Sequence, residues 1–266
     1  MKRRIGARSV SEGACAILAL LAISVLTACS SAPTYPQPQG SNGQILVQLQ
    51  GEPKEGVGKA SMREVQDEYS RHRESVEKGK AFERVDYDDL KDVVVIVQFP
   101  GPILSDVPLP PPAAGELELD DDGFNRVQLL ARKNRPGHKG SATFTLQNLR
   151  DTTVHIYGFN ETDGSFEGEV SANSLGTIKV RDPGRYDIYC DEDETLHCVL
   201  FVTENSYAWI GSSDDDAFFN HVPPGSCEIH VFPPRLPEWS KTINVKAGKR
   251  ETLKAELTVN NLPKAE

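Results

Sequence analysis

The chain has 266 residues and a formal net charge of −10, and its 38% hydrophobic and 26% charged residues are typical of a globular protein rather than a disordered or multi-spanning one. An acidic chain repels the phosphate backbone of nucleic acids, and no basic stripe interleaved with aromatic residues overrides that repulsion. We therefore expect no nucleic-acid partner.

The first 28 residues have the regions of a signal peptide. A basic start at Lys2–Arg8 precedes an apolar run, Ala14–Leu26, that is too short to span a bilayer comfortably. The run ends in Leu-Thr-Ala-Cys at 26–29, which resembles the lipobox of bacterial lipoproteins. The resemblance implies that Cys29 is acylated and becomes the first residue of the mature protein. Two or three acyl chains hold a protein on a membrane stably.

This anchor predicts a location in the bacterial cell envelope, with the membrane as a partner through the lipid. In a cell with two membranes, Ser30 after the cysteine implies the outer membrane, facing the periplasm. Residues 30–43 are rich in Pro, Gln, Ser and Gly, which cannot bury enough surface to offset chain entropy. Residues 29–43 are therefore predicted to form a flexible tether.

The body begins with a β-like segment at 44–49, where apolar residues alternate with glutamines. Residues 61–78 follow a helical pattern instead, with Ser61 as an N-cap and Gly79 as a stop. We expect one exposed amphipathic helix there, inserted in a β domain.

The remaining pattern predicts a mainly β protein. The β-branched run Val93–Phe99 is typical of a buried strand, and residues 100–112 are too rich in proline to join a sheet. Short apolar segments separated by Gly, Asp and Asn then recur, which favours β-sandwiches. Further strands are expected at 117–119, 127–130, 142–149, 154–159, 175–180, 186–190, 198–203, 207–210, 217–221, 227–232, 241–245 and 252–259. We place a first domain at 44–203, a second at 204–260 and a tail at 261–266.

Four motifs, in a fixed order, carry a family resemblance: Asp92–Val95, Val154–Tyr157, Pro183–Cys190, and Val222–Gly225 followed by Arg235–Pro237. In this order they resemble the plastocyanin-like proteins of the methylamine-utilisation type, joined to a carboxypeptidase-regulatory-like, or transthyretin-like, domain. The resemblance implies a cupredoxin-like Greek-key β-sandwich followed by a small transthyretin-like β-sandwich.

In that family two imidazoles, a thiolate and a thioether bind copper, a set that suits this metal. His155 and Cys190 match two of these ligands, whereas Asp193 stands at the second histidine and Leu196 at the methionine. The copper site is therefore expected to be degenerate. His197 offers an alternative ligand with His155 and Cys190, although adjacent residues on a strand point to opposite faces.

A disulfide between Cys190 and Cys198 is a competing possibility, because the cell envelope permits oxidation. Closing that nine-residue loop would contribute roughly 2.6 kcal/mol in the chain-entropy model. Cys227 would then remain a free thiol, packed as a small hydrophobic side chain.

Catalytic motifs are missing from the sequence. The acidic runs at 120–122, 191–194 and 214–216 lack the ligand spacing of a calcium loop and are interpreted as solvated turns. The chain has no glycine-rich phosphate cradle, nucleophile elbow or zinc motif. We expect no enzymatic activity.

The leading hypothesis is a non-enzymatic, lipid-anchored envelope protein without a cofactor, whose degenerate cupredoxin-like domain is a binding or interaction module. One alternative is a copper-binding or electron-transfer lipoprotein that uses His155, Cys190 and His197. Another is a polysaccharide-binding protein that uses aromatic residues of the second domain, such as Tyr207, Trp209 and Trp239, although such residues more often pack in a core. The partner would be an unidentified envelope protein or a polysaccharide.

Overall fold

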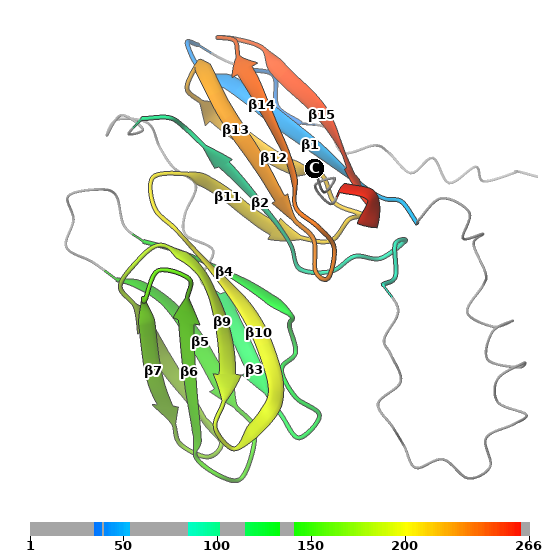
Figure 1. Cartoon of the computed structure of the whole chain (residues 1–266). Coiled ribbons are helices and arrows are strands. Elements are labelled where there is room, and N and C mark those ends of the chain that lie inside the picture. The colour runs from blue at the N-terminus through cyan, green and yellow to red at the C-terminus, as the bar shows by residue number, and fades with distance from the viewer. Residues whose placement is uncertain (1–34, 39, 54–84, 102–114, 134–140, 262–266) are drawn as a thin grey trace, which may run out of the picture. The chain divides into compact units, whose positions relative to one another are not determined.

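The computed structural model describes residues 35–38, 40–53, 85–101, 115–133 and 141–261 (Figure 1). The predicted signal peptide 1–28, residues 29–34 and 39 of the predicted tether, the predicted helix 61–78 and residues 262–266 of the tail lie outside these residues. In the ranges given, no helix is long and apolar enough to cross a membrane. The strands all lie in the second of two compact units, Pro38–Glu266.

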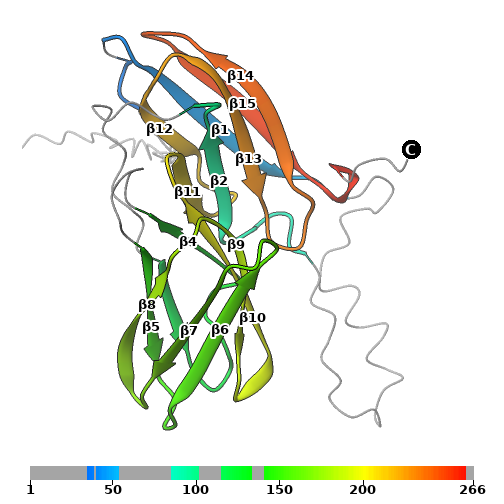
Figure 2. The same cartoon turned by 60° about the vertical axis from the view of Figure 1, so that its left-hand side comes forward.

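Two sheets form the first sandwich, and Figure 2 shows them as two layers. Their inner faces carry the buried residues of alternating strands such as Gly115–Leu119, and these residues form one core cluster. The first sheet, in the order β4-β10-β9-β6-β7, contains β4 (Gln128–Arg132), β10 (Asp193–Thr203), β9 (Gly184–Cys190), β6 (Val154–Asn160) and β7 (Ser165–Val170). The other, in the order β3-β5-β8, contains β3 (Gly115–Leu119), β5 (Ala142–Asn148) and β8 (Ser174–Val180).

A second sandwich surrounds its own hydrophobic cluster. One sheet, in the order β12-β1-β15, contains β12 (Ala217–Val222), β1 (Gly43–Gly51) and β15 (Arg250–Leu257). The other, in the order β11-β2-β13-β14, contains β11 (Tyr207–Gly211), β2 (Val93–Gln98), β13 (Gly225–Phe232) and β14 (Trp239–Val245). A short 3₁₀ turn, Val259–Asn261, follows β15. The mainly β fold predicted from the sequence is confirmed.

The strand pairing corrects the predicted domain boundaries of 44–203 and 204–260. β1 lies parallel to β15 and antiparallel to β12, and β2 lies between β11 and β13, so both belong to the second sandwich. Figure 1 shows the blue strand β1 beside the red strand β15. The first sandwich is therefore inserted between β2 and β11. Hydrophobic alternation predicts that a segment is a strand, but it does not say which strand lies next to it.

A third apolar cluster joins the two sandwiches. Leu130, Val199 and Phe201 of the five-stranded sheet meet Val94 of β2, and Phe201 lies 4.7 Å from Phe232 between ring centroids. The Gln128 side-chain amide donates to the carbonyl of Phe232 at 3.1 Å.

Asp92, immediately before β2, adds a polar contact to this interface. Its Oδ2 accepts a hydrogen bond from the Val127 N–H at 3.1 Å, and its Oδ1 lies 3.4 Å from the Arg126 guanidinium. Burial raises the pKa of Asp92, although these contacts oppose that shift. The carboxylate thus sits in a partly dehydrated junction between the sandwiches.

Tyr186 fixes the turn that leads into β9. Its hydroxyl donates to the carbonyl of Asp182, four residues earlier, at 3.0 Å, and its ring is buried in the first core. Gly184 has a φ of 146°, which L-residues with a side chain rarely adopt. This arrangement resembles the tyrosine corner of other Greek-key sandwiches.

Replacement Tyr186→Phe is expected to lower the free energy of unfolding by about 1 kcal/mol, because it leaves the Asp182 carbonyl without its hydroxyl donor. Denaturant unfolding of the full chain in neutral detergent, followed by far-ultraviolet circular dichroism, measures this. Tyr157→Phe is the control, since its ring lies half-buried on an outer face. An equal loss in both variants would contradict a specific role for the corner.

Candidate functional site

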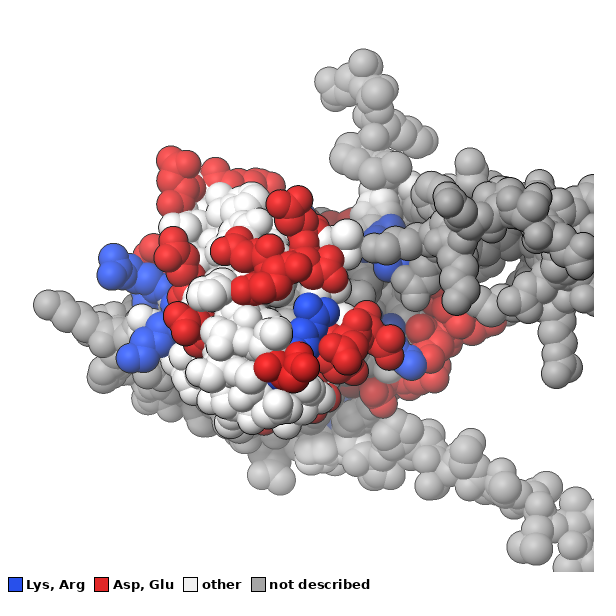
Figure 3. Space-filling model, turned by 90° about the horizontal axis from the view of Figure 1, so that it is seen from below, with Lys and Arg blue, Asp and Glu red and all other residues white. Residues whose placement is uncertain are grey.

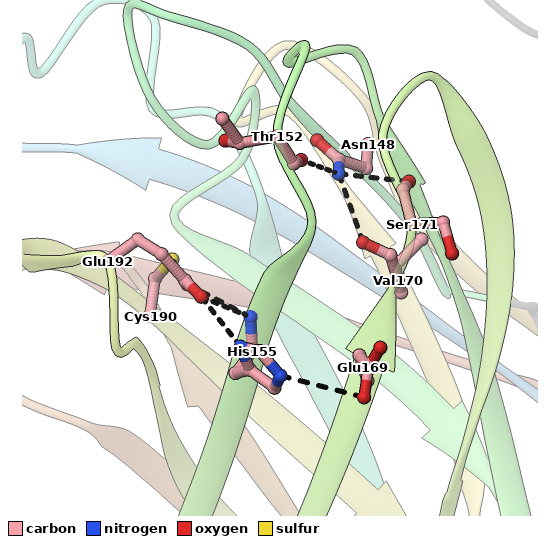
Figure 4. A network of polar contacts seen from close by, with 8 residues as sticks. All are labelled: Asn148, Thr152, His155, Glu169, Val170, Ser171, Cys190 and Glu192. Carbon is pink, nitrogen blue, oxygen red and sulfur yellow. Dashed lines mark hydrogen bonds and ion pairs between the residues drawn. The ribbon is translucent and has the colours of Figure 1, made fainter.

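Several loops meet at the end of the first sandwich where β9 turns into β10. Asn148, fully buried at the end of β5, ties them together. Its side-chain amide donates to the carbonyls of Thr152, Val170 and Ser171 at 2.8 to 3.1 Å (Figure 4). Arg150 extends the connection by donating from Nε to the carbonyl of Asp120 at 2.8 Å. The loop that precedes β6 is thus held against the turns after β3 and β7.

Glu192, in the β9–β10 turn, connects the predicted residues His155 and Cys190 (Figure 4). Its carboxylate lies 2.7 Å from His155 Nδ1 and accepts the His155 backbone N–H at 2.9 Å. The Cys190 thiol donates to the same carboxylate at 3.3 Å. The other ring nitrogen of His155 lies 3.5 Å from Glu169 on β7. The network therefore consists of one thiol, one imidazole and two carboxylates.

The hydrogen bonds of this network set the ionisation of its members. Burial opposes the charged form of Glu192, but hydrogen bonds from His155 and Cys190 outweigh it and lower the pKa of Glu192 to about 2. The stability that ionised Glu192 contributes to the fold is complete above the ordinary glutamate pKa of 4.5 and is lost as the pH falls through about 2.

The hydrogen bond with Glu192 raises the pKa of His155, and the charges of Glu192, Glu169 and Asp191 add to the shift. The stability that protonated His155 contributes is complete below the ordinary histidine pKa and is lost as the pH rises through the raised pKa of His155. Burial and the contact with Glu192 raise the pKa of the Cys190 thiol. The thiol is thereby held neutral rather than activated.

Acidic side chains surround the network. Figure 3 shows this end of the molecule with many acidic and few basic side chains. The turns there, with the start of β10, contain Asp120, Asp121, Asp122, Asp151, Asp191, Glu192, Asp193 and Glu194. Such a surface favours cationic partners over anionic ones.

The predicted metal ligands His155, Cys190 and His197 do not converge. Cys190 points into the first core, whereas His155 and His197 are exposed. His197 Nε2 lies 2.9 Å from Asp187 Oδ1, and its ring packs on Tyr189. Within the described ranges, no group of three or more His, Cys, Asp or Glu side chains is arranged to hold a metal ion.

The two residues at the substituted ligand positions have structural roles. Asp193 Oδ1 accepts hydrogen bonds from the backbone and hydroxyl of Thr195 at 3.0 and 2.6 Å. Leu196 packs against the first core. The residues present therefore do not fit the copper ligand set implied by the resemblance.

The predicted Cys190–Cys198 disulfide is not formed, since both thiols and that of Cys227 are free and buried. Cys198 lies opposite Ile188, two residues before Cys190, so the cysteines are diagonal neighbours on the inner face. Diagonal pairs lie about 7 to 8 Å apart, which exceeds the usual span of a disulfide. Burial raises the pKa of Cys227 to about 11 and raises that of Cys198 further, in keeping with packing roles.

The aromatic residues considered for sugar binding belong to the second core. Tyr207 is fully buried, and Trp209 and Trp239 pack against the same cluster. An outward-facing group on the first sandwich was not predicted from the sequence. It is formed by Tyr157 and Phe159 of β6, Tyr189 of β9 and His197 of β10. We call this group the aromatic face. Its signal was present in the alternation of aromatic and buried residues along Val154–Asn160.

No protein-family profile matches the chain, and no curated protein matches it. Among solved structures, a copper(I) form of an amicyanin variant is 11% identical and covers 33% of this chain and 80% of its own, with a TM-score of 0.27. An oxidised amicyanin variant is 12% identical and covers 41% of this chain and 98% of its own, with a TM-score of 0.28.

Replacement Glu192→Gln is expected to lower the pKa of His155 toward the ordinary histidine value, because the imidazolium loses its closest carboxylate. NMR titration of the histidine ring protons in the full chain measures the change. Glu194→Gln removes an equal charge two residues further along, at the start of β10, and serves as the control. The network is misassigned if Glu194→Gln shifts His155 as much as Glu192→Gln does.

Proposed function

We propose that this chain is a non-enzymatic, lipid-anchored binding protein of the bacterial cell envelope, with a cupredoxin-like first sandwich that serves as a binding module instead of a copper centre. The observation that carries the proposal is the position of Glu192. A carboxylate joins the thiol and the imidazole that the resemblance would assign to copper.

The chemistry of this arrangement supports a role without metal. A copper–thiolate centre of this type requires an ionised thiol and two imidazoles around one metal. Here the pKa of Cys190 is raised, and the neighbouring carboxylate opposes a second negative charge. The second imidazole, that of His197, is engaged by Asp187 and the ring of Tyr189.

The same groups argue against covalent catalysis. The thiols of Cys190, Cys198 and Cys227 are all buried with raised pKa values, so none has the thiolate character of a nucleophile. A binding role needs no such group. The acidic surface at this end of the first sandwich favours a partner that carries positive charge.

The envelope location rests on the sequence around Cys29. The basic start, the apolar run and the lipobox-like ending together support acylation and retention on a membrane. Residues 30–43 would then hold the sandwiches away from the bilayer surface.

Addition of copper(II) to the reduced full chain in neutral detergent is expected to give no intense visible absorption, because the site offers one imidazole, a buried neutral thiol and a competing carboxylate. An amicyanin measured in parallel is the positive control. A stoichiometric, intense band that His155→Ala abolishes would overturn the proposal in favour of a copper-binding protein.

Replacement Cys29→Ser is expected to abolish lipid attachment, because Cys29 alone among the five cysteines stands at the end of the apolar run. Metabolic labelling with a fatty acid in a bacterial host measures this. Cys15→Ser, within the apolar run, is the matched control and should retain the label. Full labelling of the Cys29→Ser protein would refute the anchor.

A further inference from the structure

Strand register assembles four side chains into one row across the outer face of the five-stranded sheet. Glu167 of β7 lies opposite Tyr157 of β6. Tyr157 in turn lies opposite Tyr189 of β9. On the other side of β9, Tyr189 lies opposite His197 of β10. The rings of Tyr157 and Tyr189 stack with centroids 5.7 Å apart, and those of Tyr189 and His197 lie 5.1 Å apart.

The next row extends this surface. Phe159 stacks on Tyr189 at 5.6 Å with an interplanar angle of 17°, yet its side chain is 48% exposed. A sheet face that displays a stacked phenylalanine to water has apolar area without a partner. The aromatic face thus presents ring surface that the described part of the chain leaves exposed.

Carboxylates border these rings. An open depression of about 640 Å³ lies along β6 and β7. Its lining includes the aromatic side chains of Tyr157 and Phe159, the imidazole of His155, and the carboxylates of Glu167, Glu169 and Asp191. Rings next to carboxylates attract a cation in two ways, through the π face and through direct ion pairing.

The rest of the same sheet face is already an interface. Val199 lies two residues beyond His197 on β10 and opposite Asp187 of β9. It belongs to the cluster that joins the two sandwiches. Phe201, further along β10, packs on Phe232 of the second sandwich. The aromatic face therefore continues an established apolar interface at the point where the second sandwich stops covering it.

We propose that the aromatic face and its bordering carboxylates bind a basic peptide segment of a partner protein through its arginine side chains. A guanidinium group stacks on aromatic rings and pairs with carboxylates at the same time, so it matches both the rings of the aromatic face and the carboxylates that border them. The charge of the neighbouring turns, visible in Figure 3, attracts such a segment and repels an acidic one. This inference rests on the proposed binding role and adds its surface and its ligand chemistry.

Fluorescence anisotropy of a labelled hexa-arginine peptide, titrated with the full chain in neutral detergent, tests the inference. Phe159→Ala and Glu167→Gln are each expected to weaken binding about fivefold, because one removes stacking and the other a carboxylate. Leu175→Ala and Glu116→Gln are matched controls on the other sheet and should leave binding unchanged, since both residues are exposed there. Unfolding midpoints of all four variants identify any loss of fold.

Three results would overturn the inference: no binding of hexa-arginine, equal weakening by Glu116→Gln and Glu167→Gln, or peptide binding that Phe159→Ala does not alter. Equal weakening by the two glutamate variants would mean that the peptide is attracted diffusely by the acidic charge of the whole protein. Binding of a neutral glucan hexamer that Phe159→Ala abolishes, with no effect of that variant on hexa-arginine, would assign the aromatic face to a polysaccharide instead. Copper titration and fatty-acid labelling are independent of these results, so the proposed function can stand when this inference fails.

Discussion

Glu192 holds the β9–β10 turn against the start of β6 by accepting from the His155 backbone and the Cys190 thiol while pairing with the His155 ring. A carboxylate of depressed pKa thus links the start of β6 to the end of β9. The same carboxylate contributes to the raised pKa of the Cys190 thiol, which favours the neutral thiol.

Insertion of the first sandwich between β2 and β11 determines which surfaces remain available. The chain leaves the second sandwich after β2 and returns to it at β11, and a cluster that includes Val94, Val199 and Phe201 joins the two sandwiches. This junction covers the outer face of the five-stranded sheet at Leu130, Val199 and Phe201. The aromatic face lies on the same side of the sheet, toward the β9–β10 turn. The exposed rings thus lie beside the region where the packing between the sandwiches ends.

The sequence predicted the strand content well, because alternation along segments such as Val154–Asn160 reports directly on a half-buried sheet. It placed β1 and β2 in the wrong sandwich, since partners distant in the chain leave no local pattern. It also missed β7, in which Gly168 interrupts the alternation; that glycine leaves room for Ile178, whose Cδ1 would lie 2.2 Å from an added Cβ. The importance of Glu192 was hidden because a residue in an acidic turn is usually solvated, and only the fold brings it to His155.

Buried side chains and internal hydrogen bonds order the end of the first sandwich where β9 turns into β10. Cys190 is fully buried in the core, and Leu196 packs against the same cluster, so two positions that the resemblance assigns to metal ligands contribute apolar burial. Asn148 supplies three hydrogen bonds between the adjoining loops, and Glu192 supplies the links between β6 and β9. Internal hydrogen bonds from Asn148 and Glu192 thus tie the loops at this end of the sandwich to one another and to β6.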